Sequence, residues 1–238
     1  SAAQPRQVCH RRMTPDDALA ALEAQGNAQK AAEMAAYHKV ERRYPGVANP
    51  VLDALAKDWR KEMDVEARVA LAAALWQNGS HEARILAAKL LTQARLRPSD
   101  DSAWALIQTW VADFDAWAIA DHACIAGQKR LVWQPDRIED IADWHYSDHM
   151  WTRRAALVIT LPWTKQNHPK PDDLAIRDRV LGWAATYATD PDWFIQKAVA
   201  WWLRELSKHD PARTRAFLDE HGAQMKPFAR KEAARKLP

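Results

Sequence analysis

Residues 193–206 read WFIQKAVAWWLREL, and this stretch decides the fold class. Trp193, Lys197 and Trp201 follow one another at intervals of four residues, which places all three on one face of a helix. Small and apolar residues follow the lysine, a pattern typical of a packed helix. The stretch therefore predicts a helix that presents basic and aromatic side chains together.

The same pattern recurs along the chain. A basic residue followed by small, apolar residues also begins at Arg84, Arg154 and Lys231, and with Lys197 the successive spacings are 70, 43 and 34 residues. The first spacing is about two units of 35 residues, and the missing unit falls at the segment WAIAD, residues 117–121. Such periods indicate helix pairs stacked as a solenoid, in which equivalent positions face one concave groove. Arg followed by Ala is common in any alanine-rich helix, but the spacing favours a repeat.

The rest of the chain fits this fold, because helical periodicity runs throughout it. Capping residues mark helix starts within residues 14–17, 80–82, 98–101, 190–192 and 209–211. We expect an all-α, right-handed α-solenoid of about six or seven HEAT-like helical hairpins with a basic concave groove. It would form a single domain over residues 13–238. Residues 1–12 are expected to be an N-terminal extension, partly disordered or left over from cloning.

Composition argues against several classes of protein. The 238 residues include only 6 glycines, and none of the motifs GxGxxG, GxxxxGK[ST] and GxSxG occurs. Cys9 and Cys124 are far apart and form no CxxC motif, so neither a disulfide framework nor a thiolate zinc site is expected. The sequence has no apolar run of about 18 residues and no signal-peptide core. We therefore expect a soluble, cytoplasmic protein.

Charge and tryptophan are concentrated towards the C-terminus. The net charge is +3, yet residues 1–150 contain 18 basic and 21 acidic residues, whereas residues 151–238 contain 16 and 10. Of the 13 tryptophans, 11 lie at or after Trp104. A basic, tryptophan-rich half suits a polyanionic partner, with nucleic acid first among them. On charge alone, a solvated basic surface over a tryptophan-rich core is an equal alternative.

Asp121 is the carboxylate that most needs an explanation. It follows Trp117 by four residues and shares its helix face, inside an apolar segment. An unpaired carboxylate in such a stripe costs several kcal/mol, so Asp121 needs a partner. Arg154, one repeat later, is the candidate.

Two other groups of reactive side chains are weaker candidates. His145 and His149 stand four residues apart, with acidic residues near, and this spacing could hold zinc. No third ligand and no HExxH motif accompany them, so we expect surface histidines and no metal site. Cys124 has apolar neighbours and is expected to be an inert, buried thiol.

Four segments resemble the AlkD-type DNA alkylation repair glycosylases, a family of HEAT-like solenoids. The resemblance covers about residues 33–237, and residues 193–206 carry its most specific part. Order and spacing agree in all four segments: MAAY at 34–37 leading to YPGVANP at 44–50, WAIAD at 117–121, MWTRRAAL at 150–157, and residues 193–206, continued by KEAA at 231–234.

The resemblance implies roles for individual residues. It places the catalytic aspartate at Asp121 and the two tryptophans that contact the lesion at Trp117 and Trp201. Other implied DNA contacts are Arg154, which would hold the backbone beside the lesion, and the aromatic residues Trp193, Phe194 and Tyr37.

The basic residues of the last two repeats look like phosphate contacts. Lys197 and Lys231 occupy the repeated basic position and are the first choices, followed by Arg204. The chain also departs from the family pattern, with Ala118 where an Asp is frequent. Val51, Leu52 and Asp53 replace the usual basic residues, which puts N-terminal phosphate contacts in doubt.

The implied activity is that of a monofunctional hydrolase in base excision repair. It would excise cationic purines alkylated at N3 or N7, such as 3-methyladenine and 7-methylguanine, from double-stranded DNA. A fixed carboxylate at Asp121 would stabilise the oxocarbenium character of the sugar and position the water. Indole faces would attract the cationic nucleotide by about 0.5–2 kcal/mol each. The family is implied to leave the lesion stacked, unlike glycosylases that flip the base.

No cofactor, metal, membrane or obligate protein partner is expected, and a monomer is the family expectation. One alternative is a catalytically silent HEAT-like relative that binds DNA structures such as branches. A pure DNA binder, however, has no evident need for a buried Asp121. A second, less favoured alternative is a HEAT protein-interaction scaffold, which would have an apolar or acidic concave face.

Overall fold

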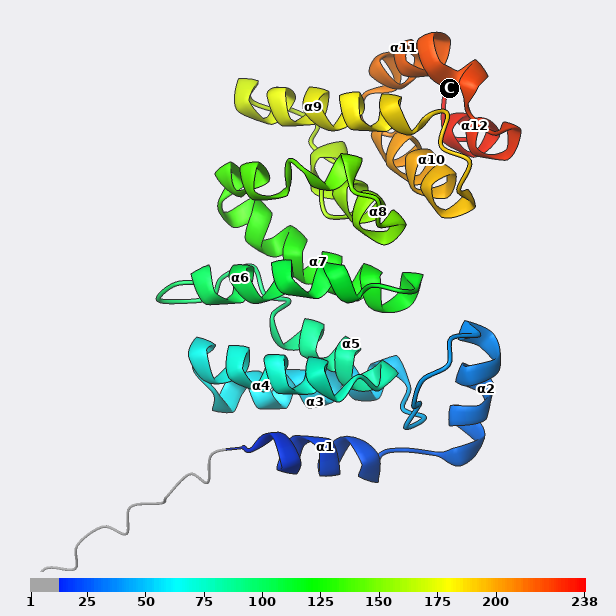
Figure 1. Cartoon of the computed structure of the whole chain (residues 1–238). Helices are drawn as coiled ribbons and strands as arrows, with labels where there is room; N and C mark the ends of the chain where they lie inside the picture. Colours follow the sequence, from blue (N-terminus) through cyan, green and yellow to red (C-terminus); the bar gives the residue numbers. More distant parts are fainter. Residues whose placement is uncertain (1–12) are drawn as a thin grey trace, which may run out of the picture.

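The computed structural model describes residues 13–238, and the regular structure within this range is entirely helical. The expected all-α solenoid is confirmed (Figure 1). The prediction of an extension over residues 1–12, and Cys9 with it, lies outside the described residues. Within residues 13–238, no helix is both long enough and apolar enough to cross a membrane.

Twelve α-helices and five short 3-10 segments follow one another in residues 13–238. The helices are α1 (Pro15–Ala24), α2 (Ala28–His38), α3 (Asn49–Glu62), α4 (Val65–Asn78), α5 (His81–Leu90), α6 (Asp101–Trp110), α7 (Trp117–Trp133), α8 (Met150–Val158), α9 (Pro171–Tyr187), α10 (Trp193–Ser207), α11 (Pro211–His221) and α12 (Pro227–Ala234). The 3-10 segments are η1 (Val111–Asp113), η2 (Pro135–Ile141), η3 (Trp144–Tyr146), η4 (Leu161–Thr164) and η5 (Gly222–Gln224).

The helix starts lie where the capping residues predict them. Side-chain oxygens at four of these caps accept a backbone N–H of the first turn: Thr14, Ser80, Asp192 and Asp210. Asp100 caps α6 without such a bond, because its buried carboxylate pairs with Arg130 and Arg137 at 2.7 and 2.6 Å. A cap signal therefore located this helix start correctly although the side chain has another use.

The helices alternate between two layers. Helices α3, α5, α7, α8, α10 and α12 form an inner layer in which each helix packs against the next. Helices α1, α4, α6, α9 and α11 form the outer layer, where α1 contacts α4, α4 contacts α6, and α9 contacts α11. Between α7 and α8 the chain has no outer helix and instead forms η2 and η3. The stack rises from α1 to α12 (Figure 1) and brings equivalent positions of successive repeats together.

Helix α2 lies beside the stack and none of its residues is fully buried (Figure 1). The turn that follows it is fixed by Glu82 of α5, whose Oε2 accepts the backbone N–H groups of Gly46 and Val47 at 2.6 and 2.8 Å. Gly46 has a φ of +85°, and a Cβ there would overlap the carbonyl oxygen of Asn27 at the start of α2. Glycine is therefore required where the turn and α2 meet.

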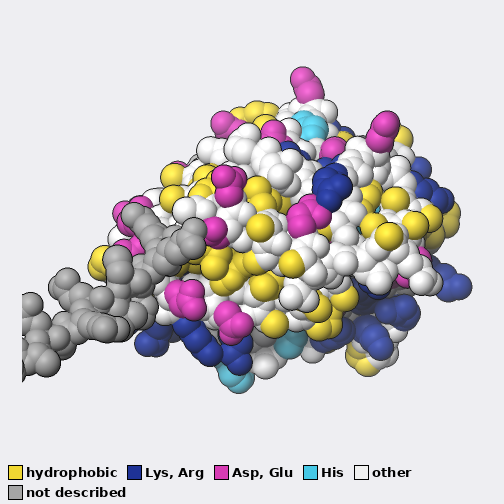
Figure 2. Space-filling model, turned by 90° about the horizontal axis from the view of Figure 1, so that it is seen from below, with side chains coloured by type: hydrophobic (Ala, Val, Ile, Leu, Met, Phe, Trp, Pro, Cys, Tyr) yellow, Lys and Arg dark blue, Asp and Glu magenta, His cyan; other side chains and the backbone are white. Residues whose placement is uncertain are grey.

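Most of the tryptophans belong to the core. Seven are buried, namely Trp59, Trp76, Trp104, Trp110, Trp163, Trp183 and Trp202. They join one continuous cluster of buried apolar residues that runs from α1 to α12. A tryptophan-rich core thus accounts for more than half of the indoles, and only the accessible ones are candidates for binding. Figure 2 shows Lys and Arg gathered towards the lower and right-hand margins of one face.

Candidate active site

The inner layer forms a cavity of about 310 Å³ between four successive helices. Eight of the ten site residues expected from the sequence line it, so the solenoid brings together positions from distant parts of the chain. The cavity is lined by Trp117 and Asp121 of α7, Arg154 of α8, Trp193, Phe194, Lys197, Trp201 and Arg204 of α10, and Glu232 of α12.

The expected pairing of Asp121 with Arg154 is confirmed. Asp121 Oδ1 accepts a hydrogen bond from Arg154 Nη1 at 2.6 Å, and the two side chains are only 21% and 7% exposed. Asp121 Oδ2 makes no hydrogen bond to another residue of 13–238 and remains available to a ligand. The Arg154 guanidinium also lies 5.6 Å from the Trp151 ring. Packing and ion pairing therefore hold the carboxylate in one position with one oxygen free.

Three tryptophans offer accessible surface at this cavity. Trp117 and Trp193 are 38% and 50% exposed, and Trp201 is half-buried. Trp193 stacks on Phe228, and Phe194 packs against Trp151. Trp201 stacks on no other aromatic ring of the described residues. Its indole is thus available to a planar or cationic ligand.

The cavity contains a second carboxylate that the sequence analysis did not identify. Glu232 of α12 pairs with Lys197 Nζ at 2.8 Å and with Arg204 Nη1 at 2.5 Å. Burial by itself would raise the pKa of Glu232, but the ion pairs with Lys197 and Arg204 outweigh it and lower that pKa below its ordinary value. Glu232 is therefore ionised at neutral pH, and both cations are partly neutralised by it.

A simple spacing rule finds Glu232 in retrospect. Asp121 and Arg154 are 33 residues apart, and Lys197 and Glu232 are 35 residues apart. Each pair joins neighbouring helices of the inner layer, α7 with α8 and α10 with α12. A search for opposite charges one repeat apart identifies both pairs, whereas a search for repeated basic residues leads to Lys231.

Two of the expected site residues lie outside this cavity. Lys231 is exposed and does not line it, because the neighbouring residue Glu232 takes that position on α12. Tyr37 of α2 lies on the other side of Trp117, with its ring centroid 6.2 Å from that of the indole and the two planes nearly perpendicular. Tyr37 is 69% exposed and lines a separate cavity.

The two histidines are partly buried rather than exposed on the surface, and Cys124 is buried as expected. Both ring nitrogens of His149 are engaged, with Thr152 Oγ1 at 2.7 Å and the Phe114 carbonyl at 2.8 Å, and His145 Nδ1 lies 2.6 Å from the Ala142 carbonyl. No group of three or more His, Cys, Asp or Glu side chains within residues 13–238 is arranged to hold a metal ion. Cys124 is buried, and its burial raises the pKa of the thiol far above its ordinary value.

Comparisons with known proteins bear on the family and the fold of this chain. A family described as DNA alkylation repair enzyme matches residues 18–237. The fold is similar to that of a predicted DNA alkylation repair enzyme from Enterococcus faecalis, with a TM-score of 0.75 and 24% identity over 90% of this chain and 97% of that one. It is also similar to AlkD2 from Streptococcus mutans, with a TM-score of 0.64 and 18% identity over 94% and 99% of the two chains. No curated protein sequence matches the chain.

Proposed function

The chain belongs to the DNA alkylation repair enzyme family, and from this premise we propose that it is a monofunctional DNA glycosylase. It would hydrolyse the N-glycosidic bond of cationic purines alkylated at N3 or N7 in duplex DNA. The observation that carries the proposal is the fixed carboxylate of Asp121, which keeps one free oxygen beside the accessible faces of Trp117 and Trp201.

The reaction requires little chemistry from the protein, because an alkylated purine already carries a positive charge. When the bond from C1′ to the base nitrogen breaks, its electron pair stays with the base and neutralises it, while positive charge develops on the sugar. Asp121 would stabilise that charge electrostatically. Its carboxylate would also accept the proton of the water that adds to C1′. No cofactor or metal is needed for these steps.

The tryptophans supply selectivity. A cationic base near an indole face gains about 0.5–2 kcal/mol from cation–π attraction, and a neutral base gains less. Trp117 and Trp201 line the cavity from two different helices, α7 and α10. A lesion between these helices would therefore contact indole surface of both. Preference for cationic purines would then come from electrostatics rather than from a closely fitting pocket.

DNA would be held through its backbone beside this cavity. Arg154 is fixed next to Asp121 and would contact the phosphate at the lesion. Lys197 and Arg204 would contribute only in part, because Glu232 stays paired with them, and Lys231 would act from outside the cavity. We propose that the protein acts as a monomer in the cytoplasm on double-stranded DNA.

The decisive experiment is the release of methylated bases from methylated duplex DNA by wild type and by Asp121→Asn. Asp101→Asn is the matched control, because Asp101 also pairs with a buried arginine, Arg137 at 2.9 Å, but lies on α6 outside the cavity. We expect release by wild type and by the control and none by Asp121→Asn. Normal release by Asp121→Asn would refute the proposed role of Asp121.

The same experiment separates the alternatives. A wild-type protein that binds DNA tightly and in a salt-sensitive way but releases no base would be a catalytically silent DNA-structure binder. A protein that binds no DNA would be an interaction scaffold. The cavity favours neither alternative, since a scaffold gains nothing from three cations in it, and a binder has no need for the free carboxylate oxygen of Asp121.

A further inference from the structure

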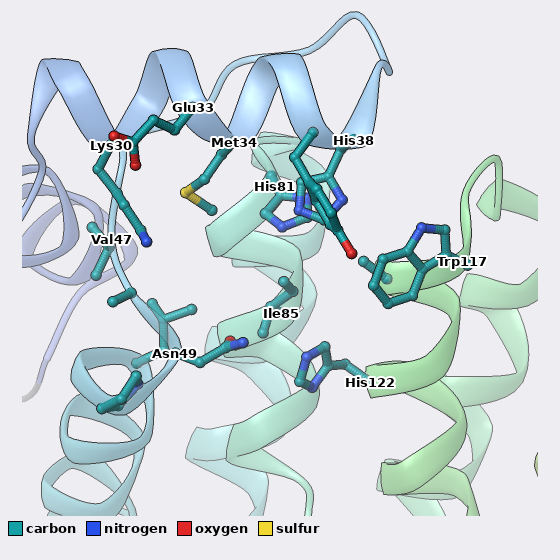
Figure 3. Close-up of a pocket in the computed structure, with 15 residues that line it drawn as sticks. Lys30, Glu33, Met34, His38, Val47, Asn49, His81, Ile85, Trp117 and His122 are labelled. Carbon is teal, nitrogen blue, oxygen red and sulfur yellow. The ribbon is translucent and has the colours of Figure 1, made fainter.

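A second cavity of about 490 Å³ lies on the other side of Trp117. Helix α2 covers it, and the start of α3 together with α5 and α7 form its remaining walls (Figure 3). Its volume falls within the range of small-molecule sites. Because Trp117 lines both cavities, the second one is a direct neighbour of the cavity that contains Asp121.

Three histidines line this second cavity, and all three are uncharged at neutral pH. Burial lowers the pKa of His81 to about 3 and that of His122 to about 4, and burial together with the charge of Arg42 lowers the pKa of His38. A neutral imidazole carries one N–H donor and one nitrogen acceptor. The cavity therefore offers both kinds of hydrogen-bonding group without charge.

The polar atoms of these rings have no partners within residues 13–238. The ring nitrogens of His38, His81 and His122 make no hydrogen bond to another described residue, although His81 is only 4% exposed. The side-chain amide of Asn49, which extends into the same cavity (Figure 3), is likewise unpaired within this range. These groups are therefore free to exchange hydrogen bonds with water for hydrogen bonds with a ligand that carries matching donors and acceptors.

Flat aromatic surfaces surround these groups. The His38 ring lies 4.4 Å from that of His81 and 5.7 Å from that of Trp117, measured between centroids. Tyr37 adds a further ring against Trp117. Planar rings favour a planar aromatic ligand that can lie against them.

The two cavities differ in how many charged side chains line them. Arg154, Lys197 and Arg204 line the first cavity together with Asp121 and Glu232, whereas the charged side chains that line the second, among the described residues, are Lys30 and Glu33 alone. A cation gains nothing from the neutral imidazoles of the second cavity. A flat ligand with donors, acceptors and no net charge fits it best.

From these observations we propose that the second cavity binds an uncharged nucleobase. The base has two possible sources: an unpaired base of the bound duplex, or the purine that becomes neutral when it is released. The proposal depends on the proposed function in one respect only: DNA binding or base excision has to supply the base.

The test measures binding of the uncharged, fluorescent base 2-aminopurine without any catalytic step. In one arm the free base is titrated with protein. In the other, a duplex carries 2-aminopurine opposite a stable abasic analogue. We expect wild type to quench the fluorescence in at least one arm, and the responding arm identifies the source. No quenching in either arm would overturn the proposal.

Two substitutions remove hydrogen-bonding groups from the cavity, His122→Phe and Asn49→Leu. Each should weaken 2-aminopurine binding roughly 3- to 10-fold, as expected for the loss of one or two hydrogen bonds. Asn49 is exposed, so its substitution does not threaten the fold if His122→Phe fails to fold. The matched control is His168→Phe, at an exposed histidine outside both cavities. Wild-type affinity in both cavity variants would refute the assignment.

This result is independent of base excision. Quenching that depends on His122 and Asn49 in a protein that releases no methylated base would contradict the proposed function and support the nucleobase site. Excision without any 2-aminopurine binding would support the proposed function and contradict the nucleobase site.

Discussion

Glu232→Gln is expected to strengthen DNA binding and to make it more dependent on salt. In the free protein the Glu232 carboxylate occupies two cations that face the cavity, Lys197 at 2.8 Å and Arg204 at 2.5 Å. The amide of glutamine keeps the size of the side chain but removes the charge. Both cations then become available to phosphate oxygens.

The structure sets limits on the size of this effect. Lys197 has no other carboxylate partner within residues 13–238, whereas Arg204 keeps Glu205 at 4.0 Å. One to two additional phosphate contacts are therefore expected, and each contributes about 0.9 to the slope of log K against log salt. The slope should steepen by about 0.9 to 1.8, which corresponds to about 3- to 12-fold more affinity lost between 50 and 200 mM salt.

Fluorescence anisotropy of a labelled duplex, titrated at several salt concentrations, measures this slope. Glu139→Gln is the matched control, because Glu139 also pairs with an arginine, Arg179 at 2.5 Å, but lies on η2 outside the cavity. Both variants lose one negative charge, so a general charge effect would appear equally in the two. A slope equal to that of wild type, or an equal change in both variants, would refute a role of Glu232 in occupying phosphate-binding cations.

Three further predictions concern stability and selectivity. The folded pKa values of His81 and His122 lie near 3 and 4, below the ordinary 6.5. The unfolded chain therefore takes up protons first as pH falls below 6.5, and the folded state, fully stable above that pH, loses stability. At pH 5 the loss is about 2 kcal/mol per histidine, and denaturant unfolding of His81→Phe should show a flatter pH dependence. Trp201→Ala should reduce the preference for cationic over neutral lesions by about 2- to 30-fold, measured as the ratio of kcat/KM for the two substrates. Gly46→Ala should lower stability by about 1 kcal/mol or more, because φ is positive and a Cβ overlaps Asn27, and a thermal melt as high as that of wild type would contradict this.

The sequence predicts the fold well because its signals are local. Caps such as Ser80 and Asp192 act within one turn, and helical periodicity needs only the residues of one helix. The outer position between α7 and α8 is different. There the chain forms η2 and η3 instead of a helix, and only packing against the neighbouring helices settles that outcome.

The candidate site is predictable from the sequence only where one residue requires a partner of opposite charge. Asp121 in an apolar stripe requires a cation, and the repeat length points to Arg154, so this pair follows from the sequence. Glu232 lies among charged residues near the C-terminus, so the sequence around it does not require a particular cationic partner. Its importance depends on the rotation of α12, which places Glu232 rather than Lys231 against α10. The cavity with three histidines is less predictable still, because His38 comes from α2, which lies outside the stacked layers, and only the folded structure brings it to α5 and α7.

The placement of Trp117 between the two cavities connects charge to the order of events. A cationic purine is attracted to the indole faces of Trp117 and Trp201 and to the free carboxylate oxygen of Asp121. Breaking the glycosidic bond neutralises that base, so the attraction that held it disappears in the same step. On the far side of Trp117 the uncharged imidazoles of His81 and His122 offer a neutral base hydrogen bonds without any charge to desolvate. Loss of charge would therefore both end binding at Asp121 and create affinity for the neighbouring cavity.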